Sequence, residues 1–217
     1  MVRKTLIALP AYNEAKVIGS VISGIKNEGY GEILVVDDAS KDSTYETASK
    51  AGAVVLRHVI NRGAGAATMT AIEYARDNGY LELVLLDSDG QHDPKDIKKL
   101  LRAKGDVVIG IRDWKSRTMP WSRKFFNVVG NVVTWVFFGL YVKDSQSGFK
   151  VLRRKALERI QLTYDRYEFC SELIGEIKAK RLSFSQIPIK VIYTDYSRSK
   201  GQNFLNGIKM VLRLIFR

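Results

Sequence analysis

An acidic motif in this sequence of 217 residues has the composition of a metal and phosphate site. Asp87-Ser88-Asp89 follows an apolar run directly, and Gln91 stands two residues further on. Carboxylate and amide oxygens are hard ligands that suit Mg²⁺ or Mn²⁺, and such a cation could hold a diphosphate. The sequence therefore predicts a divalent metal at Asp87, Asp89 and Gln91. A calcium loop is excluded, because its glycine stands at the sixth position and Gly90 stands at the fourth.

A second acidic pair, Asp37-Asp38, ends an earlier apolar run in the same way. Four carboxylates at one edge of a sheet repel each other unless a cation or hydrogen-bond donors neutralise them. We interpret the four as one cluster that belongs to a metal and nucleotide site. The alternative is that both pairs lie in solvated turns or serve as helix N-caps.

Other catalytic and cofactor motifs are absent from the sequence. His58 and His92 are the two histidines, and neither has the spacing of a zinc hydrolase or the order of a serine esterase. The segment 61–67, Asn-Arg-Gly-Ala-Gly-Ala-Ala, resembles a dinucleotide fingerprint, but Thr68 replaces its third glycine. We expect its small residues to let a helix pack closely on the sheet.

The single cysteine and the N-terminus both indicate a cytoplasmic protein. Cys170 cannot form an internal disulfide or a thiolate metal cluster, which favours a reducing compartment. The apolar run Thr5–Leu9 is too short for the core of a signal peptide. We therefore expect the first strand to begin almost at once.

The charge of the chain indicates an anionic partner. The formal net charge is +12. Residues 178–217 hold nine Lys or Arg and one Asp, and residues 111–124 hold five Lys or Arg and one Asp, so the rest of the chain is neutral. A nucleic-acid-binding module is one interpretation, but acidic turns at a sheet edge would repel a phosphate backbone. We therefore expect no nucleic acid and favour an anionic membrane surface or a phosphorylated substrate.

Apolar runs and helical periodicities alternate through the first half, which predicts an open, mostly parallel α/β sheet flanked by helices. The runs of buried-strand type are Leu6–Leu9, Ile33–Val36, Val54–Leu56, Leu83–Leu86 and Val107–Ile109. The helical segments are Glu14–Lys26, Ser43–Lys50, Ala64–Arg76 and Pro94–Arg102. Ligands of such sheets bind at the carboxyl ends of the strands, where the acidic motifs stand.

Two apolar segments of the second half leave alternatives open. Phe125–Val142 is eighteen residues without a charge, which is either a short membrane span or a buried or interfacial helix. Residues 204–217 form a basic amphipathic pattern, which predicts a C-terminal helix that lies on a membrane surface or docks on the domain. No linker divides the chain, so we expect a single domain over 1–217, with a donor half at 1–112 and an acceptor half at 113–217.

Six ordered motifs resemble those of the family 2 glycosyltransferases, and within them the dolichol-phosphate mannose synthases and related polyprenyl-phosphate glycosyltransferases. They are Pro10-x-Tyr12-Asn13-Glu14, Val35-Val36-Asp37-Asp38-x-Ser40-x-Asp42-x-Thr44, Asn61-x-Gly63, Asp87-x-Asp89-x-Gln91-His92, Gly110-x-Arg112 and Asp144-x-x-Ser147-Gly148-Phe149. The resemblance implies a GT-A fold and inverting transfer of a hexose from a nucleotide-sugar of the GDP-mannose or UDP-glucose type. It also implies a polyprenyl phosphate acceptor and peripheral association with the cytoplasmic face of a membrane.

The same resemblance implies roles for individual residues. The donor side comprises Pro10, Tyr12, Glu14, Val36 and Asp38 for the nucleoside, Asp87 and Ser88 for the rest of the nucleotide-sugar, and Asp89 and Gln91 for the metal. The acceptor side comprises Arg112 and Arg123 for phosphates and the loop residues Ser147, Gly148, Phe149 and Lys200. A saccharide or other soluble acceptor is the alternative; its hydroxyl would need a base, for which Asp144 is the candidate.

The sequence departs from the mannose synthases at two places. Glu168 stands about where these synthases tend to have a lysine, and the arginine that usually precedes Gly-x-Ser-Lys is missing around Thr194–Ser197, although Ser199-Lys200 is present. The departures leave the sugar and the base of the donor open, whereas the class of reaction does not depend on them.

Overall fold

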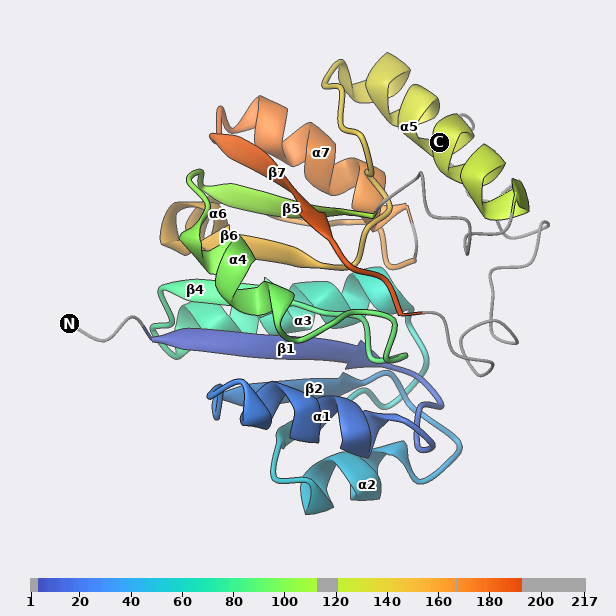
Figure 1. The fold of residues 1–217 in the computed structure, drawn as a ribbon, viewed down its shortest axis with the longest axis vertical. Coiled ribbons are helices and arrows are strands. Elements are labelled where there is room, and N and C mark those ends of the chain that lie inside the picture. Colours follow the sequence, from blue (N-terminus) through green and yellow to red (C-terminus); the bar gives the residue numbers. More distant parts are fainter. Residues whose placement is uncertain (1–3, 113–120, 167, 193–217) are drawn as a thin grey trace.

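A computed structural model describes residues 4–112, 121–166 and 168–192, without the side chains of residues 121–127 and 133. A seven-stranded sheet has the order β3-β2-β1-β4-β6-β5-β7 (Figure 1). Among the described strands, β6 runs antiparallel to its neighbours and the other pairings are parallel. The strands are β1 (Thr5–Ala11), β2 (Ile33–Asp37), β3 (Val54–Arg57), β4 (Glu82–Leu85), β5 (Val107–Arg112), β6 (Lys150–Arg153) and β7 (Phe184–Ile189).

Helices cover both faces of this sheet, as the alternation of elements predicts. One face carries α1, α2 and α4, and the other carries α3, α6 and α7, while α5 packs against α7 (Figure 1). Their bounds are α1 (Ile18–Asn27), α2 (Thr44–Lys50), α3 (Ala64–Asp77), α4 (Asp96–Arg102), α5 (Trp121–Phe138), α6 (Arg154–Arg159) and α7 (Phe169–Ala179).

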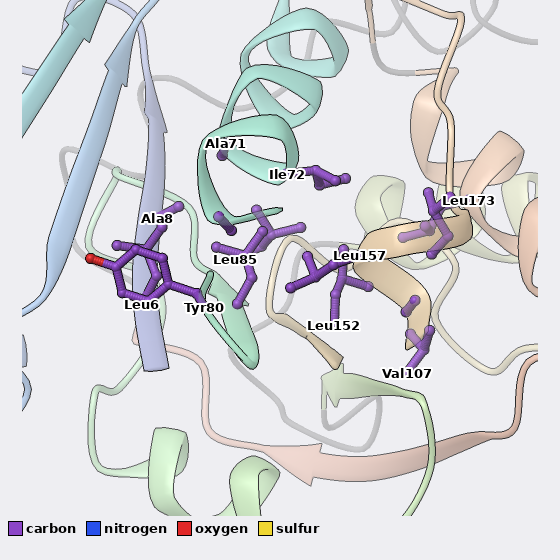
Figure 2. Close-up of a cluster of buried hydrophobic side chains, with 14 of the residues drawn as sticks. Leu6, Ala8, Ala71, Ile72, Tyr80, Leu85, Val107, Leu152, Leu157 and Leu173 are labelled. Atoms are coloured by element: carbon purple, nitrogen blue, oxygen red, sulfur yellow. The ribbon is translucent and has the colours of Figure 1, made fainter. Parts of the chain in front are cut away.

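The two cores follow from the alternation of side chains along the strands. In β1, Leu6 and Ala8 point toward α3, whereas Ile7 and Leu9 point toward α1. Figure 2 shows the first of these clusters, in which strand side chains meet apolar residues of the helices. Each fully buried large aliphatic side chain contributes roughly 1.5–3 kcal/mol of transfer free energy.

Two sequence-based expectations, the start of α1 and the burial of β3, differ from the structure. The helix expected from Glu14 begins at Ile18, because Asn13 adopts a left-handed conformation (φ 56°) and the Glu14 carbonyl accepts the N–H groups of Val17 and Ile18 in a turn. The strand at Val54 was expected to be buried on both faces, but β3 is an edge strand and Val54 is 51% exposed.

The uncharged segment Phe125–Val142 also differs from its expected bounds. Its helix is α5, which begins at Trp121 and ends at Phe138, followed by Gly139 in a left-handed conformation (φ 63°). No helix within the described residues is both long enough and apolar enough to cross a bilayer. The C-terminal helix expected over residues 204–217 lies outside the described residues.

Asp106 joins the loop before β5 to the starts of β7 and α6. Its Oδ2 accepts hydrogen bonds from the backbone N–H and hydroxyl of Ser183, both at 2.8 Å, and from Lys155 Nζ at 2.9 Å. Partial burial raises the pKa of Asp106, but the hydrogen bonds from Lys155 and Ser183 outweigh it and lower the pKa below its usual value. A lowered folded-state pKa contributes stability above the unfolded-state pKa of about 3.9, and this contribution disappears as the pH falls through the folded-state value.

We therefore expect Asp106→Asn to reduce the free energy of unfolding by about 1 kcal/mol or less at neutral pH, because solvent screens the ion pair. Urea unfolding at pH 7 and at pH 3 measures this difference, which should shrink at the lower pH. An equal difference at both pH values would show that the charge of Asp106 does not stabilise the fold.

Candidate functional site

The loops that follow β1 and β2 are hydrogen-bonded to each other at the carboxyl edge of the sheet. The Asn13 N–H donates to Ser40 Oγ at 2.9 Å, and Asn13 Oδ1 accepts the Lys41 N–H at 2.8 Å. The Glu14 N–H donates to Thr44 Oγ1 at 2.8 Å. These motif residues therefore fix the shape of the two loops in which the predicted nucleoside residues stand.

Asp38 is buried and accepts four donors from the loop after β3. Its Oδ1 lies 2.7 Å from His58 Nδ1 and 2.9 Å from the Arg62 N–H. Its Oδ2 lies 2.8 Å from Asn61 Nδ2 and 2.7 Å from the Gly63 N–H. This carboxylate thus holds the loop at residues 61–63 in place, and its predicted contact with a nucleoside stays a prediction.

The buried carboxylate of Asp37 is compensated by Arg57 and by the Ser40 N–H. Its Oδ1 accepts the Ser40 N–H at 3.0 Å, and its Oδ2 lies 3.3 Å from Arg57 Nε without hydrogen-bond geometry. The four carboxylates do not form one metal-binding group, because Arg57 and the donors around Asp38 compensate the pair after β2, and β1 lies between β2 and β4 in the sheet. A contact of this pair with a nucleotide stays a prediction. Within the described part of the chain, no three His, Cys, Asp or Glu side chains gather to hold a metal.

The motif after β4 leaves two carboxylates beside each other. Asp87 has an exposed side chain whose Oδ2 lies 3.1 Å from His92 Nε2. Asp89 Oδ1 accepts the Gln91 N–H at 3.0 Å, and Asp89 Oδ2 accepts the Gln91 side-chain amide. Ser88 is buried, and its hydroxyl donates to the Pro10 carbonyl at 2.7 Å, which ties this turn to the end of β1.

The two carboxylates differ in their affinity for protons. Although about half of the Asp87 side chain contacts solvent, the protein atoms crowded around it desolvate the carboxylate and tend to raise its pKa. The hydrogen bond from His92 and the charges of Lys150 and Arg112 outweigh this effect and lower the pKa. Burial and the charge of Asp87 raise the pKa of Asp89. A cation between them would relieve this repulsion, and the available oxygens are of the type that Mg²⁺ and Mn²⁺ accept. Asp87, Asp89 and Gln91 therefore suit a divalent metal in the chemistry of their donors.

An ion pair with Asp144, in the loop between α5 and β6, orients Arg112 at the end of β5. Asp144 is fully buried, and its Oδ2 accepts the Arg112 Nε–H at 2.7 Å and the Arg112 backbone N–H at 3.1 Å. Its Oδ1 accepts Arg112 Nη2 at 2.7 Å. This two-pronged arrangement fixes the plane of the guanidinium, and it occupies both oxygens of Asp144.

The sequence model of the family described as glycosyl transferase family 2 matches residues 6–161. The chain belongs to this family. An uncharacterized protein of Methanocaldococcus jannaschii is 40% identical over 97% of this chain and 90% of its own length. A UDP-N-acetylglucosamine–dolichyl-phosphate N-acetylglucosaminyltransferase of Methanococcus voltae is 35% identical over 96% and 94% of the two chains.

A solved structure confirms the GT-A fold of this glycosyltransferase. Glucosyl-3-phosphoglycerate synthase from Mycobacterium tuberculosis, crystallised with Mn²⁺, uridine diphosphate and phosphoglyceric acid, superimposes with a TM-score of 0.77. It is 19% identical, and the match covers 99% of this chain and 76% of the synthase. The expected fold class and the expected enzyme class, a glycosyltransferase, are both confirmed.

The remaining predicted site residues of the glycosyltransferase differ in their exposure to solvent. Tyr12 is 41% exposed at the sheet edge, so its ring is accessible to a nucleoside, whereas Val36 is fully buried. Phe149 is also fully buried and packs against the His92 ring, with 5.2 Å between centroids. Arg123 lies in α5, but its side chain is outside the described part, as is all of Lys200.

The loop at residues 144–149, which is predicted to contact the acceptor, touches the acidic motif directly at Gly148. A Cβ on Gly148 would overlap the Asp87 carboxylate, so only glycine allows this approach. Ser147 is buried, and its carbonyl accepts a hydrogen bond from the buried Lys150 Nζ, which also lies 3.9 Å from Cys170 Sγ. Burial raises the pKa of the Cys170 thiol. The loop at residues 144–149 and the acidic motif at residues 87–91 therefore lie against each other.

Lys150 belongs to none of the sequence motifs, although a lysine between the apolar residues Phe149 and Val151 was a signal for it. Lys150 is 1% exposed and its charge acts on Asp87. Burying a lone cation costs free energy unless an anion compensates it, so its position beside the acidic motif indicates that it balances these carboxylates. The sequence also gave no signal for the Arg112–Asp144 pair as a unit.

The small residues at the start of α3 allow close packing on the sheet, as expected, because Ala67 is fully buried in one core with Leu6 and Ala8 of β1. The glycines of the same segment pack closely on a second side, against residues 164–166. A Cβ on Gly65 would overlap the Tyr164 carbonyl, and one on Gly63 would overlap the Asp165 carbonyl. The Asp165 carbonyl accepts the N–H groups of Gly65 and Ala66 at 2.8 and 3.1 Å. The first turn of α3 is thus covered by residues 164–166 rather than open to a pyrophosphate.

Proposed function

We propose that this enzyme transfers a hexose from a nucleotide-sugar to a polyprenyl phosphate, with inversion at the anomeric carbon. The observation that carries the acceptor class is the match with the dolichyl-phosphate transferase of Methanococcus voltae over nearly the full length of both chains. A dolichol-phosphate mannosyltransferase of Pyrococcus furiosus is also 30% identical over 99% of this chain and 63% of its own length. The donor half is assigned to residues 1–112 and the acceptor half to residues 113–217.

In the proposed reaction an oxygen of the lipid phosphate bonds to the anomeric carbon while the bond from this carbon to the nucleoside diphosphate breaks. A lipid phosphate is already an anion near neutral pH, so the reaction needs no general base. Mg²⁺ or Mn²⁺, when bound, would neutralise the diphosphate that leaves. Asp87, Asp89 and Gln91 would hold this cation, and Tyr12 would contact the nucleoside.

Arg112 is the proposed phosphate ligand on the acceptor side, together with Arg123. Since Asp144 uses both oxygens to hold Arg112, we assign it a positioning role rather than that of a base. Asp144 lowers the cost of orienting the guanidinium, so Arg112 meets the phosphate already aligned. The remaining predicted groups, Ser147, Gly148 and Lys200, would form the wall of the acceptor site.

A transfer assay tests the proposal. UDP-glucose, UDP-N-acetylglucosamine and GDP-mannose are each supplied with a short-chain, water-soluble polyprenyl phosphate and either Mg²⁺, Mn²⁺ or a chelator. We expect a glycosyl polyprenyl phosphate from one donor, and no product with the chelator or with the polyprenol that lacks a phosphate. Transfer to a saccharide or to phosphoglycerate, with none to the lipid phosphate, would contradict the proposed acceptor.

We also propose that the enzyme is peripherally associated with the cytoplasmic face of a membrane, where its lipid acceptor resides. The excess positive charge supports this location, because Lys and Arg near anionic headgroups contribute about 1 kcal/mol each. The basic residues of 193–217 lie outside the described part of the chain.

A further inference from the structure

The described side chains of α5, from Val128 to Phe138, include an apolar stripe that faces outward. The side that faces the protein contains the polar residues Asn131, 8% exposed, and Thr134, 1% exposed, together with Phe138, which packs against Gly175 of α7. The opposite face carries exposed Val128, Val132 and Trp135, together with Val136. A helix of a water-soluble domain places its apolar stripe toward the core, so this outward stripe lacks a partner within the described structure.

The outward stripe runs from Val128 to Val136 in the described part of the helix. Val128, Val132, Trp135 and Val136 stand at i, i+4, i+7 and i+8, the spacing that brings side chains onto one face. Their exposed fractions are 51, 49, 53 and 67%. Just beyond the helix, Tyr141 is 60% exposed. Contiguous exposed apolar surface of this kind marks a site of interaction with protein or membrane.

A polar network explains why α5 presents this face outward. Asn131 Oδ1 accepts the backbone N–H and the hydroxyl of Ser145 at 2.9 and 2.8 Å, and Asn131 Nδ2 donates to the Lys143 carbonyl at 2.6 Å. Thr134 Oγ1 lies 2.8 Å from Ser171 Oγ of α7. These buried hydrogen bonds fix the rotation of the helix, because turning the polar face outward would leave their partners unpaired.

The charge around the stripe identifies what it fits. Residues 114–143, which include all of α5, contain five Lys or Arg and no Asp or Glu. A second copy of the chain would bring the same cations together, and residues 196–217 are likewise cationic without an acid. An anionic lipid surface complements both the apolar stripe and the flanking cations, as it does for interfacial amphipathic helices.

We propose that the outer face of α5, formed by Val128, Val132, Trp135 and Val136, is the surface with which the enzyme docks on an anionic bilayer. The inference rests on the proposed function, because the acceptor phosphate would lie in the same lipid surface. Asn131 ties α5 to Ser145, and Ser145 adjoins Asp144, which holds Arg112. The docked helix thus fixes the position of the phosphate-binding arginine relative to the headgroups.

The docking surface is tested with vesicles of phosphatidylcholine and phosphatidylglycerol. We expect the double variant Trp135→Gln/Val136→Gln to bind these vesicles about tenfold or more weakly than the unaltered protein. Val54→Gln is the matched control, since Val54 is 51% exposed at the opposite end of the sheet order and should bind normally. Thermal unfolding verifies that both variants fold, as expected for exposed positions.

A second measurement leaves the stripe itself unaltered. In Trp114→Phe/Trp121→Phe, Trp135 is the sole tryptophan, and lipids brominated on their acyl chains should quench its fluorescence. Vesicle binding without quenching, or equal binding by the double variant, would overturn the proposal. A dimer in analytical ultracentrifugation that the double variant disrupts would instead assign the stripe to a second copy.

Transfer to the short-chain polyprenyl phosphate separates this inference from the proposed function. We expect the double variant to retain that activity, because the acceptor does not require a bilayer. Activity without vesicle binding by the unaltered protein would refute the docking surface alone. Vesicle binding through α5 without transfer to any polyprenyl phosphate would refute the proposed function alone.

Discussion

Asp89→Asn is expected to lower the rate of glycosyl transfer by about a thousandfold or more, while the protein stays folded. Asp89 lies beside Asp87, and burial together with the charge of Asp87 raises the pKa of Asp89, so the folded protein bears a cost for ionising Asp89. The substitution removes that repulsion together with a proposed metal ligand. The melting temperature without metal should therefore be unchanged or higher.

Calorimetry and thermal shift measure the loss of metal-dependent donor binding that would accompany the lower rate. For the unaltered protein, donor nucleotide with Mn²⁺ should raise the melting temperature in proportion to the logarithm of its concentration over its dissociation constant. Asp89→Asn should show no such rise, whereas the control Asp77→Asn, at an exposed surface carboxylate, should behave as the unaltered protein does. Unchanged donor affinity in folded Asp89→Asn would rule out the metal assignment.

The proximity of Asp87, Asp89 and Gln91 was predictable because its information is local. Asp87, Asp89 and Gln91 stand within one turn after an apolar run, and parallel strands bring their carboxyl ends to one edge. The local neutralisation of Asp37 and Asp38 has the opposite origin. Their neutralising donors, Arg57 and the loop at residues 58–63, come from the next strand and its loop, and no local pattern shows these contacts.

The late strands could not be predicted for related reasons. β6 contains the buried Lys150, which interrupts an apolar run, and β7 mixes polar with apolar residues at the edge of the sheet. Neither segment has the strand pattern of the first half. The outward apolar stripe of α5 was likewise ambiguous, since an apolar helix can be buried or exposed and only the hydrogen bonds of Asn131 and Thr134 decide its rotation.

The pair Arg112–Asp144 exemplifies long-range information, because its members are separated by 32 residues and meet across the ends of β5 and the loop at residues 144–149. Asp144→Asn should reduce turnover by about a hundredfold and the free energy of unfolding by roughly 3 kcal/mol, since it leaves a partly buried guanidinium without its anion. Arg112→Lys should have a similar effect on turnover, because an ammonium cannot reproduce the fork.

A double-mutant cycle separates a positioning role of Asp144 from a role as general base. If Asp144 acts through Arg112, Asp144→Asn/Arg112→Lys will be no slower than either single variant, and the slope of rate against pH will be unaltered. Glu82→Gln is the matched control, because Glu82 forms a buried ion pair with Arg153 at 3.2 Å on the same sheet, away from the acidic motif. It should destabilise the fold without changing turnover. Additive losses in the cycle, with an acidic limb of the pH profile that disappears in Asp144→Asn, would identify Asp144 as a base and favour an acceptor hydroxyl over a lipid phosphate.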